Sequence, residues 1–144
     1  MGLIDEEAEF VLEPLLALVL FLLTILSLLF SYLYWWASSV SSLFDGVVFA
    51  VTFAVIMGAH EIGHFIAAKR RGFAVSFPMF IPFPVVFGTL GAIIAIKERP
   101  PNRRAMLEMA LAGPLFGFLA MLVVLGLFSI FGDDTATGGP LGAP

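Results

Sequence analysis

A series of long apolar runs leaves few folds open to this chain. The runs cover about 14–36, 46–70 and 103–131. A helix needs about 20 apolar residues to cross the hydrocarbon core of a bilayer, and each run meets that length. Since 60% of the 144 residues are hydrophobic and 12% are charged, an ordinary soluble domain is excluded. We predict an α-helical polytopic membrane protein with about three transmembrane helices.

Residues at the ends of these runs indicate where each helix begins. Pro14 suits the opening turn of the first helix, and Asp45 is the expected N-cap of the second. Asn102 follows a Pro-Pro pair and is the expected N-cap of the third. Residues 132–144 have the composition of a linker and are predicted to form a disordered tail. The chain, residues 1–144, is expected to form a single membrane domain.

The segment 73–98 is apolar but does not have the pattern of a membrane-spanning helix. Proline and glycine interrupt it repeatedly, and FGTLGAIIAIK, from Phe87 to Lys97, has the β-branched content of a strand. Non-helical backbone at membrane depth is tolerated only where protein or a watery cavity satisfies it. We therefore predict a membrane-embedded strand or re-entrant segment between helices two and three, with a cavity beside it.

The stretch MGAHEIGHFIAA, from Met57 to Ala68, contains both histidines of the chain. His60 and His64 lie on one helical face, where two imidazoles can bind one Zn²⁺. Glu61 can take a proton from water that the metal activates. The alternative, a pair of interhelical polar residues, is weaker because ionisable groups inside a membrane are costly and usually functional. The chain has no cysteine, so any metal must be held by nitrogen and oxygen.

A catalytic zinc site normally has three protein ligands, and the sequence offers few candidates for the third. Asp45 lies on the same predicted helix as His60, about 22 Å away by helical rise. Asp133 and Asp134 follow the far end of the third helix and are read as a solvated turn. These three carboxylates are therefore poor candidates.

Glu108 is the remaining weak candidate for a metal ligand. It lies in the first turns of the third predicted helix, at a depth comparable to that of the histidines. A salt bridge to Arg103 or Arg104, each within helical reach, is the stronger reading of Glu108.

The basic residues predict an orientation. All seven Lys and Arg residues lie in the connection 69–104, and the positive-inside rule places such a connection in the cytoplasm. We expect an integral, multi-pass membrane protein with its N-terminus and this connection in the cytoplasm. The net charge of -4 argues against a nucleic acid partner, whereas the lipid bilayer is required by the composition.

From about Ala59 to Gly117 the sequence resembles the site-2 protease family of intramembrane zinc metalloproteases, in particular its archaeal and plastid-type branch. The matching segments are, in order, HEIGHFIAAKRRG, FPMFIPFP, FGTLGAIIAIKERPPNRRA and AGPLFG. The resemblance implies cleavage of transmembrane protein substrates near the cytosolic face of the bilayer. It also implies that His60 and His64 are zinc ligands and that Glu61 is the general base and acid.

The resemblance further implies that an unwound substrate adds to a strand edge of the 73–98 segment by β-augmentation. The candidate substrate-binding residues lie at the start of the run from Gly88 to Ile96, and they are Gly88, Thr89, Leu90 and Gly91. The alternative for this run, equally open, is a structural hairpin packed against the catalytic helix.

The sequence departs from the family in the third zinc ligand. Site-2 proteases supply it from an Asp-Gly motif on a later helix, and no such helix follows here. We expect the chain to be an N-terminal portion of a longer protease. The alternatives are a catalytically silent module that binds membrane proteins, a site that another chain completes in a homo-oligomer, and, with less support, a metal-transport protein.

Overall fold

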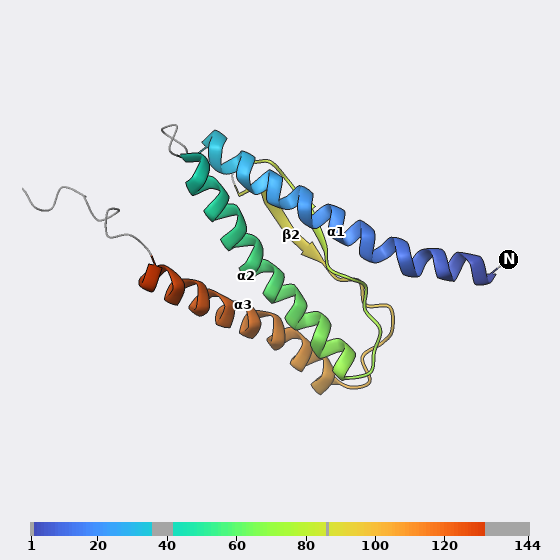
Figure 1. Ribbon diagram of the computed structural model, residues 1–144. Helices are drawn as coiled ribbons and strands as arrows, with labels where there is room; N and C mark the ends of the chain where they lie inside the picture. The colour runs from blue at the N-terminus through green and yellow to red at the C-terminus, as the bar shows by residue number, and fades with distance from the viewer. Residues whose placement is uncertain (1, 36–41, 86, 132–144) are drawn as a thin grey trace, which may run out of the picture.

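The computed structural model describes residues 2–35, 42–85 and 87–131, which form three long helices and a two-stranded sheet. The central helix, α2, packs against both α1 and α3, and the sheet lies beside α1 (Figure 1). The bounds of the elements in chain order are Gly2–Trp35 for α1, Ser42–Arg70 for α2, Met79–Pro82 for β1, Thr89–Ile93 for β2 and Arg103–Phe131 for α3.

Each helix contains a stretch long and apolar enough to cross a membrane, which confirms that prediction. The stretches are Leu12–Trp35, Leu43–Arg70 and Arg103–Phe131. Most large apolar side chains on these helices are exposed, as expected where lipid is the solvent. The buried positions of α3 are small residues, namely Ala105, Gly113 and Gly117.

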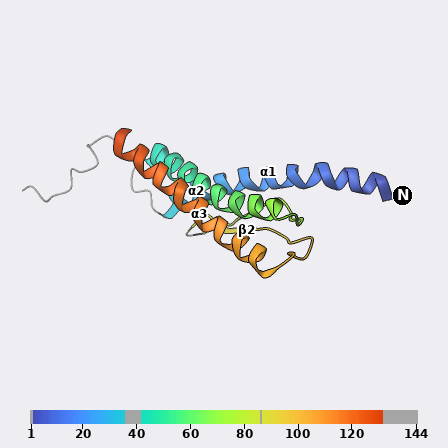
Figure 2. The same ribbon diagram turned by 90° about the horizontal axis from the view of Figure 1, so that it is seen from below.

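The first helix begins earlier than predicted. α1 begins at Gly2, so Pro14 lies inside the helix rather than in its opening turn. The predicted membrane span from about 14 agrees with the apolar stretch Leu12–Trp35. The residues before Pro14 include Leu, Glu and Ala, which favour helix, and they extend α1 on the N-terminal side of its apolar stretch. This end of α1 reaches beyond the other elements in both views (Figures 1 and 2).

The second helix also begins earlier than predicted. α2 begins at Ser42, so Asp45 lies in its first turn rather than at the N-cap. A carboxylate in the first turn still interacts favourably with the positive end of the helix dipole. Acidic residues are therefore favoured both at the N-cap and in the first turn, where Asp45 lies. Because α2 is continuous to Arg70, Asp45 stays roughly 22 Å from His60 along the helix.

The cap of α3 is confirmed. The side-chain oxygen of Asn102 accepts a hydrogen bond from the Ala105 N–H at 2.8 Å, which satisfies one of the amides that a helix start leaves unpaired. The predicted tail, 132–144, and with it Asp133 and Asp134, lies outside the described residues.

The segment between α2 and α3 contains an antiparallel pair of strands. Met79 pairs with Ile93 and Phe80 with Ala92. The register then shifts by one residue before Pro82 pairs with Thr89. A glycine with positive φ is what a bulge of this kind requires, and Gly91 has a φ of 97°. A bridge between Val75 and Ile96 extends the pairing beyond the strands.

β1, β2 and the turn between them form a hairpin. The turn of this hairpin is attached to α1. The Ser31 hydroxyl donates a hydrogen bond to the Val85 carbonyl at 2.8 Å. Gly88 has a φ of 78°, and a Cβ added there would lie 2.6 Å from the Leu28 Cα. Only glycine satisfies both the backbone conformation and this close approach to a helix.

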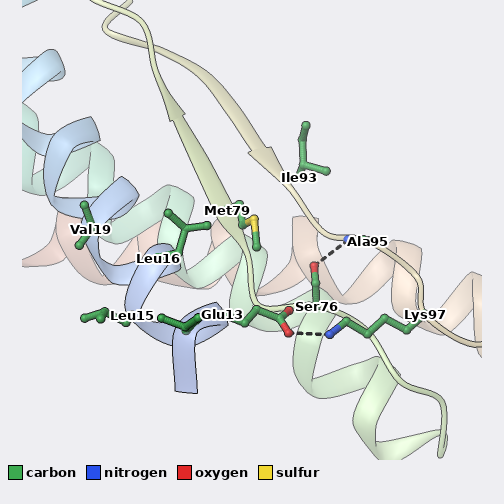
Figure 3. Close-up of a pocket in the computed structure, with 10 residues that line it drawn as sticks. Glu13, Leu15, Leu16, Val19, Ser76, Met79, Ile93, Ala95 and Lys97 are labelled. Carbon is green, nitrogen blue, oxygen red and sulfur yellow. Dashed lines mark hydrogen bonds and ion pairs between the residues drawn. The ribbon is translucent and has the colours of Figure 1, made fainter. Parts of the chain in front are cut away.

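A second attachment lies at the other end of the hairpin. One carboxylate oxygen of Glu13 accepts a hydrogen bond from the Phe77 N–H at 3.0 Å, and the other lies 2.5 Å from Lys97 Nζ. These groups border an apolar groove of about 920 Å³ between α1 and the hairpin, which Figure 3 shows with Leu16, Val19, Met79 and Ile93 among its lining.

Candidate metal centre

The two histidines lie one helical turn apart on α2 and face α3. Their Nε2 atoms are 3.1 Å apart. His64 Nδ1 lies 2.8 Å from the Met109 carbonyl oxygen. Because a carbonyl can only accept, His64 Nδ1 is the donor in this contact, and Nε2 is the ring nitrogen that lies toward His60.

The geometry of the pair fits two ligands of one zinc ion. With Zn–N bonds of about 2.0–2.1 Å and tetrahedral angles, two ligating nitrogens lie about 3.3 Å apart. The observed separation of 3.1 Å is close to this value. Zinc-bound histidines usually donate their second ring nitrogen to a carbonyl or carboxylate, and the hydrogen bond from His64 to Met109 is of that kind.

Two glycines of α3 make room for the imidazole rings. A Cβ added at Gly113 would lie 2.2 Å from His64 Nε2, closer than any real contact. One added at Gly117 would lie 3.2 Å from the His60 Cβ. Gly113 and Gly117 are four residues apart, as are the histidines, so each glycine lies opposite one histidine. We call Gly113 and Gly117 the glycine notch.

The backbones of α2 and α3 approach closely beside the notch. A Cβ added at Gly63 would lie 2.5 Å from the Ala112 carbonyl oxygen. This close approach lies directly beside Gly113 of the glycine notch. Because Gly113 and Gly117 carry no side chain, the rings of His64 and His60 can lie against α3.

Glu61 and His64 share one pocket. Glu61 is buried, with 7% of its surface exposed. The pocket has a volume of about 320 Å³, and residues of α2, of the segment 92–96 and of α3 line it. The other lining residues are Ala92, Ile94 and Ile96 of the hairpin segment and Met106, Met109 and Ala110 of α3.

Alternate residues of the hairpin segment face two different spaces. Ala92, Ile94 and Ile96 line the pocket with Glu61, whereas Ile93, Ala95 and Lys97 line the groove against α1 (Figure 3). This alternation is that of an extended chain. Sequence reasoning did not identify Ala92, Ile94 and Ile96, because residues 92–96 are all apolar and no alternation in hydropathy separates the two faces of the strand.

The residues predicted to bind substrate, Gly88 to Gly91, are not among those that line the pocket of Glu61. Gly88 packs on the backbone of α1. The Thr89 hydroxyl donates to the Ile81 carbonyl at 2.9 Å and accepts from the Gly91 N–H at 3.0 Å, so it stabilises the hairpin. Leu90 is 64% exposed. A substrate contact stays a prediction for these residues, while the structure brings the next residues of the strand to the pocket.

Glu108 does not join the histidines. Its carboxylate pairs with Arg71 and accepts a hydrogen bond from Arg104 Nε at 3.0 Å, so the salt bridge to Arg104 expected from the sequence is present. In the described part of the chain, no three His, Cys, Asp or Glu side chains come together as a metal site. His60 and His64, whose Nε2 atoms lie 3.1 Å apart, are thus the two candidate ligands that the structure brings together.

The fold and the site define an integral membrane protein whose central helix carries an HExxH motif. Residues 48–137 match the family model described as Peptidase family M50. The chain belongs to this family, which is the site-2 protease family that its sequence resembles. No solved structure matches the chain significantly.

Several plant proteins are similar to this chain. It is 39% identical over 94 residues to "Probable zinc metalloprotease EGY2, chloroplastic" of Oryza sativa subsp. indica, which covers 65% of this chain and 17% of the relative. The EGY2 relative of Arabidopsis thaliana is 38% identical over 86 residues, 58% of this chain and 15% of the relative. The chain thus spans about a sixth of the length of the curated relatives it matches.

Proposed function

We propose that this chain carries the metal-binding helix and the substrate-binding strand of an intramembrane zinc metalloprotease that cleaves transmembrane proteins. The observation that carries the proposal is the pair of histidine Nε2 atoms 3.1 Å apart within an apolar helix, with buried Glu61 and His64 lining one pocket. Membership of Peptidase family M50 and relatives named as zinc metalloproteases support it.

His60 and His64 would hold the zinc ion through their Nε2 atoms. When bound, zinc supplies Lewis acidity, which polarises a peptide carbonyl and makes water a stronger acid. The Glu61 carboxylate takes the proton of the attacking water and passes it to the leaving nitrogen. The C–N bond then breaks to give a new carboxyl group and an amine.

The third ligand of the zinc ion is proposed to lie outside the described residues. Two histidines alone should bind zinc weakly, because catalytic zinc normally has three protein ligands. A further part of the protein or a second copy of the chain, in a homo-oligomer, would supply the missing group.

β2 is proposed to hold the substrate in extended form. A helical substrate hides its carbonyls, and pairing with a strand edge exposes them. Within the described residues, β1 is the one strand that pairs with β2, and it lies between β2 and α1. A segment added at the other edge of β2 would pass over Ala92 and Ile94, beside the pocket of Glu61.

The site is proposed to act near the cytosolic face of the bilayer. His64 lies five residues before Lys69, the first residue of the basic connection 69–104. We propose that this connection and the N-terminus are cytoplasmic. The hairpin is then embedded at membrane depth, where its backbone is satisfied by strand pairing and by α1.

The direct test is Glu61→Gln in the protein that contains this chain, assayed on a transmembrane reporter in proteoliposomes. Loss of the proton carrier should lower cleavage by roughly 100-fold or more while zinc is retained. Glu98→Gln, an exposed carboxylate on the loop before α3, is the matched control and should keep full cleavage. Cleavage by Glu61→Gln at the rate of the control would contradict the role of Glu61.

A second candidate function is capture of membrane proteins without cleavage. The observation that favours it is that the described residues bring together two metal-binding groups rather than three. Wild-type protein that holds zinc and crosslinks to the reporter at β2, but leaves it uncleaved, would support capture. Cleavage by the wild type would exclude it.

A further inference from the structure

A crevice separate from the pocket of Glu61 lies between the basic ends of α2 and α3. Its volume is about 340 Å³. Ile66 and Ala67 of α2 and Ala112 and Phe116 of α3 form its apolar part. The residues on α2 belong to a different face of the helix from Glu61 and His64, so this crevice is not part of the candidate active site.

The mouth of the crevice carries an excess of positive charge. Arg70, Arg71 and Glu108 line it. The Glu108 carboxylate is shared between Arg71 and Arg104. With Arg70, which also lines the crevice, three arginines and one glutamate leave a formal net charge of about two positive at the mouth. The Arg104 side chain is 81% exposed, and Arg70 is also exposed. These guanidinium groups retain N–H donors for another anion.

An apolar crevice beneath a basic mouth matches a lipid with an anionic headgroup. Basic residues at the ends of membrane helices lie at the level of the headgroups, and basic pockets between such helices bind anionic headgroups. An arginine fork can donate two parallel hydrogen bonds to a phosphate. The apolar part below distinguishes a phospholipid from free phosphate, because it would take the start of an acyl chain.

We propose that this crevice binds an anionic phospholipid, with the phosphate at Arg70 and Arg71 and an acyl chain against Ile66 and Phe116. The lipid bridges α2 and α3 beside the close backbone approach at Gly63 and Ala112, which line the same crevice. This proposal is independent of protease activity, because it concerns charges and a crevice outside the candidate active site.

The test counts lipids retained by the detergent-purified protein in native mass spectrometry. Phosphatidylglycerol and phosphatidylcholine with the same acyl chains are offered at equal concentration. We expect selective retention of phosphatidylglycerol, and a loss of roughly tenfold in the double variant Arg70→Gln with Arg71→Gln. The matched control is Arg99→Gln with Arg103→Gln, which removes the same charge outside the crevice lining and should retain the lipid.

A second variant tests the apolar part without changing any charge. Ala67→Leu fills the crevice from α2 and should also reduce retention of phosphatidylglycerol. Glycerol phosphate, offered as a soluble competitor, should fail to displace the lipid at equal concentration. Equal retention of the two lipids, equal loss in the control variant, or full displacement by glycerol phosphate would overturn the proposal.

Discussion

The side chain of His64 is fixed from two directions. Its Nδ1 donates to the Met109 carbonyl, and its Nε2 edge rests on Gly113 of the glycine notch. The spacing of His60 and His64 was predictable, because residues four apart share a face of any helix. Their partners on α3 were not, because the pairing of two helices depends on packing that spacing within one helix does not encode. Glu108 shows the same limit, since Arg71 is distant in sequence.

Gly113→Ala should displace the His64 ring and weaken zinc binding. The added Cβ would lie 2.2 Å from His64 Nε2 in the present geometry, so either the ring or α3 must move. We expect the zinc dissociation constant to rise at least tenfold. The rise would be measured by competition with a chelator on the purified protein.

Gly126→Ala provides the control on the same helix. An added Cβ there meets nothing within 4 Å, and replacing a mid-helix glycine by alanine should stabilise α3 by roughly 0.5–1 kcal/mol. Its zinc affinity should match the wild type. Equal zinc affinity in the two variants would show that the glycine notch does not position His64.

The hairpin and the start of α3 were predictable from the sequence only in part. Strand content in 73–98 was predictable from β-branched residues, and the cap at Asn102 from the Pro-Pro pair before it. The bulge at Gly91 was not, because it is defined only by pairing with β1. Ala92, Ile94 and Ile96, which follow the bulge, line the pocket of Glu61, whereas substrate binding at Gly88 to Gly91 stays a prediction.

Asn102→Ala should destabilise the start of α3. The Ala105 N–H would lose its acceptor, and loss of an N-cap lowers the free energy of unfolding by about 1 kcal/mol. Asn102→Ser keeps an oxygen that can cap and should stay near the wild type. Denaturation in mixed micelles would measure both. A cost for serine as large as that for alanine would contradict the cap.

Glu13→Ala should loosen the attachment of the hairpin to α1. The Phe77 N–H would lose its acceptor and Lys97 its carboxylate. Amide hydrogen exchange at Phe77 should therefore become faster. Glu13→Gln keeps an oxygen that can accept from Phe77 and should exchange more slowly than the alanine variant. The same exchange rate in wild type and Glu13→Ala would exclude the attachment.

The three helices are organised around α2, which contacts α1 and α3 and carries both histidines of the chain. Composition predicted three helices able to span a membrane, since the apolar runs are long enough on their own. The early start of α1 was not predictable from apolar length, because the helix continues before its apolar stretch through residues that include Leu, Glu and Ala. Within the described residues, the third metal ligand is not brought to the histidines.

The proposed orientation makes a labelling prediction. The chain has no cysteine, so single cysteines can be introduced without background. Arg99→Cys, in the basic connection, should react with a membrane-impermeant thiol reagent only after intact cells are permeabilised. Phe131→Cys, at the far end of α3, should react before permeabilisation. The reverse pattern would show that the basic connection is not cytoplasmic.

Zinc content is the most direct test of the central claim, that His60 and His64 form a zinc site. It should be measured by elemental analysis on the purified protein that contains this chain. We predict about one zinc per chain in the wild type and in Glu61→Gln, and loss of zinc when His60→Ala and His64→Ala are combined. Zinc that survives the loss of both histidines, or a wild type that takes up none when zinc is supplied, would contradict the account.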